Sequence, residues 1–168
     1  MLWLYNIIYF ELILAIYFAQ ILETAKKQEL KDITTELCSL PNKVEEALKC
    51  EENIMVIAKQ LFKEKDVFYI GRGVDYTTAE EASLKLKEIS YIHCESYAAG
   101  ELKHGTIALI EKGVNVIGII TDNNLVKKTV SNMEEIITRG AVTTAILNEG
   151  VVKELDTSIF DNVITVPN

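Results

Sequence analysis

Four short runs of apolar residues, none long enough for a helix, place the strongest constraint on how this chain folds. They are Val67–Ile70, Val114–Ile120, Val142–Leu147 and Val163–Val166. Strands that read as nearly continuous apolar runs are typical of a parallel sheet buried on both faces. Longer stretches with helical periodicity separate the runs, at Thr77–Ile92 and Asn124–Arg139, and Gly140 ends the second. This alternation predicts a three-layer α/β domain built on a parallel sheet.

The first fifty residues contain no such run and have helical patterns instead. These patterns predict helices over Glu29–Leu40 and Pro41–Lys49, and a similar pattern after residue 50 predicts a helix over Glu52–Lys65. The second helix is expected to begin at Pro41 because proline suits the first turn of a helix. We therefore predict a helical extension over residues 1–50 and an α/β domain over residues 51–168.

The segment Leu2–Leu22 is almost wholly apolar and needs its own explanation. Its length approaches that of a membrane span, but Glu11 lies near its middle, where a carboxylate costs roughly 2.5–3.5 kcal/mol. A secretory signal is disfavoured because no Lys or Arg precedes Lys26 and no small-residue cleavage site follows. The favoured interpretation is a helix buried on most sides, in this chain or against a missing neighbour, and a membrane span is the alternative.

Composition narrows the classes of function. A hydrophobic content of 49% with 25% charged residues is typical of a globular chain rather than a disordered one. The net charge of −8 argues against nucleic acid, whose phosphates require clustered Lys and Arg, and against anionic membrane surfaces. Three scattered cysteines suit neither a disulfide framework nor a zinc site, which favours a reducing cytoplasm. The sequence also has no metal-ligand spacing, and we expect neither a metal nor a cofactor.

The helical stretch after the first strand carries a row of charged residues. Glu81, Lys85 and Glu88 follow the i, i+4, i+7 spacing, so they share one edge of the helix. The neighbouring apolar row, expected to face the sheet, comprises Ala79, Ala82, Leu86 and Ile89. A carboxylate at the border of a buried face has its pKa raised by desolvation and lowered by a nearby lysine, and such opposed effects can poise a general base. Glu81–Lys85 is equally an ordinary surface ion pair worth about 0.3–0.5 kcal/mol, which is the commoner explanation of this spacing.

Loops at both ends of that helix supply further candidates. The sequence Gly71-Arg72-Gly73 follows the first strand, and its backbone N–H groups suit an anion at a helix start, although the full G-x-G-x-x-G fingerprint is absent. Asp75 or Thr77 is expected there as a helix cap. His104, in the glycine-bounded loop 100–105, is a candidate for proton transfer, with a solvated surface histidine as the alternative.

Beyond spacing, long stretches of the sequence resemble one enzyme family. LKLKEISYIH (Leu84–His93) and ESYAAGELKHG (Glu95–Gly105) carry the resemblance. It continues through FYIGRG, ALIEKGVNVIGI and SNMEEIITRGA, and through SLPNKVEEAL in the helical lead-in. These stretches resemble the isomerase part of glutamine–fructose-6-phosphate aminotransferase, also called glucosamine-6-phosphate synthase. The resemblance covers most of the chain.

The resemblance implies a fold and a reaction. The family's isomerase part has two sugar-isomerase (SIS) lobes of doubly wound, Rossmann-like α/β form, and this chain is similar to the second. The family forms glucosamine 6-phosphate from fructose 6-phosphate and glutamine, a step of amino-sugar and UDP-N-acetylglucosamine biosynthesis.

The resemblance also implies roles for individual residues. Carried over by position, Glu88 is the base that moves a proton between sugar carbons 1 and 2, and Lys85 assists at the substrate hydroxyls. His104 promotes ring opening, and in the family it reaches the active site of the partner subunit. Further substrate contacts are expected from the remaining candidates, Glu81, Arg72 and Gly73.

Several parts of the family's pattern are missing from this sequence. The glutaminase half uses a cysteine at the extreme N-terminus, whereas Leu2 follows Met1 here. The first lobe, with its Ser/Thr-rich phosphate loop, and the C-terminal tail with its imine-forming lysine are absent as well. The chain thus resembles a C-terminally truncated second lobe, which we expect to be inactive alone and to need a homodimer partner or the missing first lobe. Two alternatives stay open: a related two-lobe phosphosugar deglycase or isomerase, and a non-catalytic phosphosugar-binding or oligomerisation module.

Overall fold

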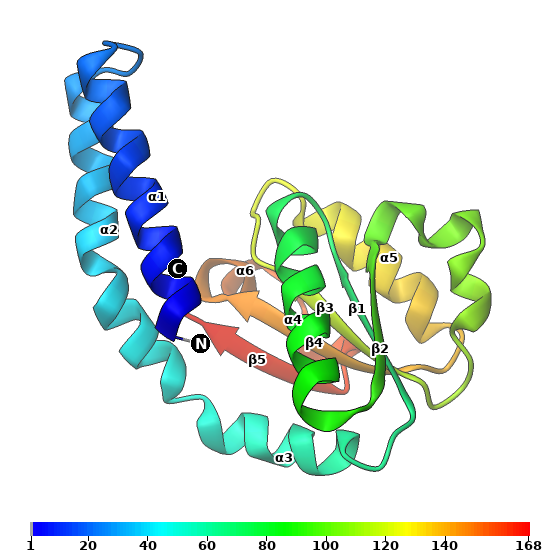
Figure 1. The fold of residues 1–168 in the computed structure, drawn as a ribbon. Helices are drawn as coiled ribbons and strands as arrows, with labels where there is room; N and C mark the ends of the chain where they lie inside the picture. The colour runs from blue at the N-terminus through cyan, green and yellow to red at the C-terminus, as the bar shows by residue number, and fades with distance from the viewer. Residues whose placement is uncertain (1) are drawn as a thin grey trace. The chain divides into compact units, whose positions relative to one another are not determined.

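The computed structural model describes residues 2–168, with side chains from Ile7 onward. The chain divides into two compact units, Met1–Glu45 and Glu46–Asn168. Helices build the first unit, and a five-stranded sheet with flanking helices builds the second (Figure 1).

The first unit is formed by α1 (Leu2–Ile21) and most of α2 (Lys27–Leu48). The predicted apolar helix is confirmed as α1, although the side chains up to Asn6 lie outside the described part. Across the described residues, no helix combines the length and the apolar character that a membrane crossing requires. Several large apolar side chains of α1 are more than half exposed, among them Phe10, Tyr17 and Leu22.

The helix break predicted at Pro41 does not occur, because α2 continues through the proline. Proline has no N–H to donate to the carbonyl one turn earlier, which here belongs to Leu37. The Tyr9 hydroxyl on α1 donates a hydrogen bond to that same carbonyl oxygen at 3.0 Å. The neighbouring helix therefore satisfies the group that Pro41 leaves unpaired, a gain of about 0.5–1.5 kcal/mol.

The second unit alternates strands with helices, as the apolar runs predict. Its strands are β1 (Asp66–Gly71), β2 (His93–Ala98), β3 (Asn115–Ile120), β4 (Val142–Asn148) and β5 (Asn162–Val166). Its helices are α3 (Glu51–Leu61), α4 (Val74–Ser90), α5 (Val126–Ile137) and α6 (Glu149–Glu154), with 3-10 turns η1 (Ala99–His104), η2 (Thr106–Leu109) and η3 (Thr157–Ile159). All neighbouring strands pair in parallel, in the order β2-β1-β3-β4-β5. This is a doubly wound order, so the predicted fold class is confirmed.

Two hydrophobic clusters, one on each face, make the sheet the middle of three layers. On β1, Phe68 and Ile70 point into the cluster that α5, α6 and η1 complete. Val67 and Tyr69 point into the other, which α3 and α4 complete (Figure 1). This alternation follows from the two-residue period of a strand, and it explains why the run is apolar on both faces.

The strand β2 is missed by reasoning from the sequence. It lies at the edge of the sheet, and most of its residues are half-buried, so it mixes polar and apolar residues instead of forming an apolar run. It also begins three residues after α4 ends, with no Gly or Pro to mark the boundary. The sequence prediction extends the preceding helix to Ile92, which is wrong by two residues.

Candidate functional site

Glycines shape the turn between β1 and α4. A Cβ on Gly71 would come within 2.5 Å of the Asp75 backbone, so the first turn of α4 can approach the strand only because residue 71 is glycine. Gly73 has φ +58, a left-handed conformation that glycine adopts without strain. At the facing loop, a Cβ on Gly100 would overlap the Arg72 guanidinium. The GRG sequence therefore has a packing explanation that is independent of phosphate binding.

Asp75 is a buried carboxylate that joins the start of α4 to the end of β3. It is 3% exposed and accepts hydrogen bonds from the Thr121 N–H at 2.8 Å, the Thr121 hydroxyl at 2.5 Å and the Asp122 N–H at 3.2 Å. No side-chain hydrogen bond caps α4, whose N-cap residue is Gly73. The helix-cap role predicted for Asp75 is therefore wrong, and its actual role depends on a partner 46 residues away.

A shallow cleft of about 360 Å³ opens beside this turn, at the carboxyl ends of the strands. Arg72, Gly73 and Glu101 of η1 help to line it. Doubly wound folds bind ligands in such crevices, where the strand order reverses between β1 and β3. A Cβ on Gly73 would lie 4.0 Å from an Asp122 carboxylate oxygen, so negative charge borders the turn and opposes a bound phosphate.

Glu81, Lys85 and Glu88 lie together on α4, as their spacing predicts. The Lys85 Nζ donates a hydrogen bond to Glu88 Oε2 at 2.9 Å and lies 3.6 Å from Glu81 Oε1. The hydrogen bond to Glu88 raises the pKa of Lys85, so this ammonium stays charged at neutral pH. The row can therefore present two carboxylates and one cation to a polyhydroxylated ligand.

The row lies where the buried face of α4 gives way to its exposed face, as its spacing predicts. The side chains of Glu81, Lys85 and Glu88 are 45%, 41% and 51% exposed. The buried residues of α4 are Asp75, Ala79 and Ser83, spaced by one turn. Ile89 is 78% exposed and does not face the sheet, although Leu86 does pack against the core.

His104 and Glu88 lie toward opposite ends of the parallel strands. η1, which ends at His104, follows the carboxyl end of β2. α4 starts at the carboxyl end of β1 and runs back toward the end where β2 begins. The fourteen residues from Val74 to Glu88 span about 21 Å of helix. One copy of the chain therefore does not bring Glu88 and His104 together. Arg72 and Gly73, which follow β1, lie at the same carboxyl ends of the strands as His104.

A polar network that the sequence reasoning did not identify links the first residues of β1 and β2. The His93 Nδ1 lies 2.7 Å from Asp66 Oδ1, and its Nε2 lies 3.5 Å from Glu95 Oε1. Tyr97 donates a hydrogen bond to Glu95, and burial together with that bond raises the pKa of Tyr97 to about 12. The alternating residues of β2 are the signal that could have found this network. No cluster of His, Cys, Asp and Glu among the side chains of residues 7–168 is suited to hold a metal ion.

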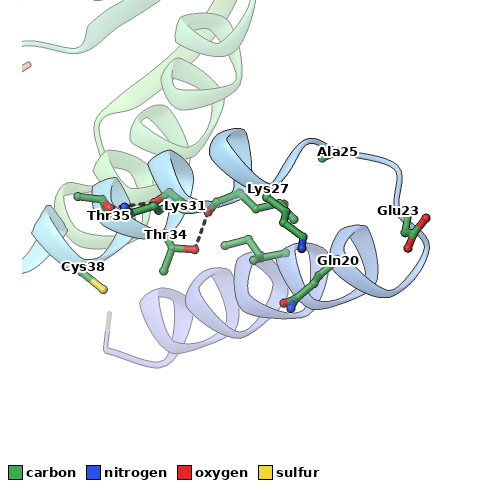
Figure 2. A pocket seen from close by; sticks show the side chains of 10 residues that line it. Gln20, Glu23, Ala25, Lys27, Lys31, Thr34, Thr35 and Cys38 are labelled. Atoms are coloured by element: carbon green, nitrogen blue, oxygen red, sulfur yellow. Dashed lines mark hydrogen bonds between the residues drawn. The ribbon is translucent and has the colours of Figure 1, made fainter.

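The first unit contains a larger groove, of about 1000 Å³, between α1 and α2 (Figure 2). Its lining mixes the apolar Ile16 and Leu30 with charged residues such as Lys27 and Lys31. None of the predicted site residues lines this groove. Its size is therefore no guide to the chemistry of the charged row.

Comparison with known proteins gives consistent matches. A family model described as SIS domain matches residues 60–150. The glutamine–fructose-6-phosphate aminotransferase of Clostridium tetani is 50% identical over 155 residues, which are 92% of this chain and 25% of that protein. The enzyme of the same name from Thermococcus kodakarensis is 49% identical over 129 residues, 77% of this chain and 21% of that protein.

Among solved structures, the chain is similar to the C-terminal domain of the aminotransferase from Francisella tularensis. The TM-score is 0.87 at 32% identity, over 92% of this chain and 43% of that one. The chain spans about a quarter of the length of the curated relatives it matches. It is thus homologous to the isomerase SIS portion of these aminotransferases, which favours the synthase over the alternative interpretations.

Proposed function

We propose, from the premise that this chain belongs to the SIS domain family, that it is the second sugar-isomerase lobe of a cytoplasmic enzyme forming glucosamine 6-phosphate. The substrates would be fructose 6-phosphate and glutamine. The observation that carries the proposal is the half-exposed, ion-paired row Glu81–Lys85–Glu88, in a chain 50% identical to a named aminotransferase. Isomerisation of a ketose to an aldose needs such a carboxylate beside two adjacent carbons.

In this proposal Glu88 takes the proton from one sugar carbon and returns it to the neighbouring one. Lys85 is charged and hydrogen-bonded to Glu88, which holds the carboxylate in place and leaves ammonium protons for the substrate hydroxyls. Glu81 orients Lys85 from the other side. His104 is the acid–base group for opening the sugar ring, and Arg72 and Gly73 contact substrate at the same carboxyl ends of the strands as His104.

Two copies of the chain are needed if Glu88 and His104 act on one sugar. The strands are about 20 Å long from one end to the other, far beyond the reach of two side chains. A homodimer in which His104 of one copy approaches Glu88 of the other removes this difficulty. The exposed apolar surface of α1 gives a further reason for self-association.

The sharpest test uses a chimera in which this chain replaces the matched quarter of one of the bacterial aminotransferases. Glu88→Gln should lower glucosamine 6-phosphate formation by about 10²–10⁴-fold, because the amide cannot act as a base. Glu80→Gln, an exposed residue on the same helix, is the matched control and should leave turnover unchanged. Full turnover in the Glu88→Gln chimera would sink the proposed function.

Mixing two inactive variants tests whether the site is shared between subunits. Co-expression of Glu88→Gln and His104→Asn chimeras gives mixed dimers with one intact site, so about a quarter of the wild-type activity should return. No recovery would place both residues in a site within one subunit. The 168-residue chain alone should form no product from glutamine or ammonia, and detectable product would contradict the need for further parts.

A further inference from the structure

Asn132 is a buried amide in the middle of α5, where its residue type needs an explanation. Its side chain competes with the backbone of a helix for hydrogen bonds, and burying an amide costs free energy unless the amide is bonded. Asn132 is 5% exposed, and its amide nitrogen donates to the Lys128 carbonyl at 2.9 Å and to the Ala99 carbonyl at 3.2 Å. Both groups that it faces are acceptors, which fixes the orientation of the amide. Since Ala99 is the first residue of η1, one buried side chain ties α5 to that turn.

The turn η1 is bound to α5 by packing and by charge as well. Ala99 and Leu102 are 0% and 1% exposed, and both belong to the hydrophobic cluster that α5 helps to complete. The Lys103 Nζ lies 3.1 Å from the Glu135 Oε1 on α5. These side chains are 57% and 36% exposed, so the ion pair contributes little, and the buried amide bond is the stronger polar link.

His104, the last residue of η1, depends on this backbone for its position. It is exposed, and among the residues that the structure describes no hydrogen bond or ion pair holds its imidazole. On the other side of the turn, a Cβ on Gly100 would overlap the Arg72 guanidinium, so the loop after β1 packs closely against η1. The path of η1 between this loop and α5 therefore determines where the imidazole lies.

We propose that Asn132 is a positioning residue that fixes η1 against α5 and thereby places His104 for ring opening. This inference rests on the proposed function, in which His104 is the acid–base group of that step. In the step, the hydroxyl on sugar carbon 2 gives up its proton as its oxygen becomes the carbonyl oxygen. The bond from carbon 2 to the ring oxygen breaks, and the ring oxygen receives a proton, so the number of protons is unchanged.

Ring opening can be separated from the later proton transfer by the choice of substrate. Fructose 6-phosphate closes its ring through the hydroxyl on carbon 5. The analogue 5-deoxyfructose 6-phosphate lacks that hydroxyl, and its phosphate blocks the oxygen on carbon 6, so it is always open. A residue that acts only through His104 is therefore needed for the first substrate and dispensable for the second, whereas a residue that maintains the fold is needed for both.

The test measures both substrates in the chimera described above, each relative to the wild-type chimera. Asn132→Leu keeps the size of the side chain and removes its N–H groups. It should lower turnover of fructose 6-phosphate by about ten-fold or more, because a displacement of about 1 Å can cost about 10²-fold in rate. Turnover of the open-chain analogue should stay within about two-fold, which also reports that the variant is folded.

His104→Asn should show the same split between the two substrates. The double variant Asn132→Leu/His104→Asn should be no slower with fructose 6-phosphate than His104→Asn alone, because two residues that act on one step are not additive. Losses that multiply in the double variant would mean that Asn132 acts independently of His104, which would overturn the proposal.

Thr129→Val is the matched control. Thr129 is a 1% exposed residue of the same helix, and its hydroxyl donates to the Leu125 carbonyl at 3.1 Å, within α5. The substitution should leave turnover of both substrates unchanged. Hydrogen exchange of the η1 amides gives a readout without activity, and it should be faster in Asn132→Leu than in the wild type or in Thr129→Val. Equal exchange in the three proteins, or the same substrate split in Thr129→Val, would contradict the assigned role.

The outcomes separate this inference from the proposed function. If His104→Asn shows the split and Asn132→Leu affects neither substrate or both equally, the function stands and the positioning role falls. If His104→Asn shows no split, the role of His104 in ring opening fails and the inference fails with it. A Glu88→Gln chimera that is fully active on the open-chain analogue would refute the role of Glu88, whatever the result at Asn132.

Discussion

The inner and outer faces of α4 differ in almost every physical respect. The inner face buries Asp75, Ala79 and Ser83, and Asp75 alone accepts three hydrogen bonds from the end of β3. The outer face presents Glu81 and Glu88, which both form ion pairs with Lys85, and all three side chains are about half exposed. One helix thus carries a polar group that holds the sheet together and a polar row available to a ligand.

The contrast shows how to separate structural polar residues from candidates for function. A buried carboxylate that has all its hydrogen-bond partners within the fold has nothing left to offer a substrate. An exposed ion pair contributes little to stability, so the charges of this row remain available to a ligand.

The largest effect on stability should come from Asp75→Ala. The substitution leaves two partly buried N–H groups and the Thr121 hydroxyl without their acceptor, which should lower the free energy of unfolding by about 2–4 kcal/mol. Glu81→Ala on the outer face is the control and should change it by less than about 0.5 kcal/mol. Urea denaturation measures both, and similar values for the two variants would erase the distinction between the faces.

High pH should weaken the packing beneath the inner face. Burial raises the pKa of Cys94 from 9.0 to about 11, and burial together with the neighbouring Cys94 raises that of Tyr69 from 10.0 to about 12. The folded state therefore retains protons that the unfolded chain loses above pH 9, so this stabilisation is complete below pH 9 and is lost between pH 9 and 12. The free energy of unfolding, measured by urea denaturation, should fall across that range, by on the order of 2–3 kcal/mol for Cys94.

Cys94→Ala provides the control for this pH dependence. The variant should be less stable than the wild type at pH 8, because it leaves a small cavity, yet its midpoint should fall less between pH 9 and 11. Equal slopes in the two proteins would mean that the Cys94 thiol does not contribute.

The smallest effect on stability should come from the outer face. Lys85→Met removes one hydrogen bond and one ion pair at a 41% exposed side chain, so the free energy of unfolding should change by no more than about 0.5 kcal/mol. The same substitution in the chimera should lower turnover, because Glu88 loses its partner. A destabilisation above 2 kcal/mol would show that the row belongs to the structural core.

Much of the fold could be predicted because buried strands leave a strong signal. The four apolar runs are β1, β3, β4 and β5, since a strand covered on both faces is apolar on both faces. The edge strand β2 is mostly half-buried and contains polar residues, so it does not form an apolar run. Pro41 predicted a helix boundary that does not occur, because the Tyr9 hydroxyl of another helix bonds to the carbonyl that the proline leaves unpaired.

The candidate site was predicted only in part, because contacts between residues close in sequence can be predicted from spacing and contacts between distant residues cannot. The contacts among Glu81, Lys85 and Glu88 follow from helical spacing, and the structure confirms them. Their exposure depends on which way α4 turns against the sheet, and the apolar Ile89 suggested the wrong face. The separation of Glu88 from His104 depends on the path of the chain across the sheet, which spacing along the sequence does not record.

The sequence by itself determined four buried strands and their alternation with helices, the α/β fold class, the membership of the charged row and the resemblance that led to the family. These features depend on local periodicity and on residues near one another in the chain. Only the tertiary structure decided that Asp75 joins α4 to β3, that the charged row is about half exposed, and that His104 and Glu88 lie toward opposite ends of the strands. Each of these depends on contacts between residues far apart in sequence, because burial is a property of the assembled layers and not of any one helix.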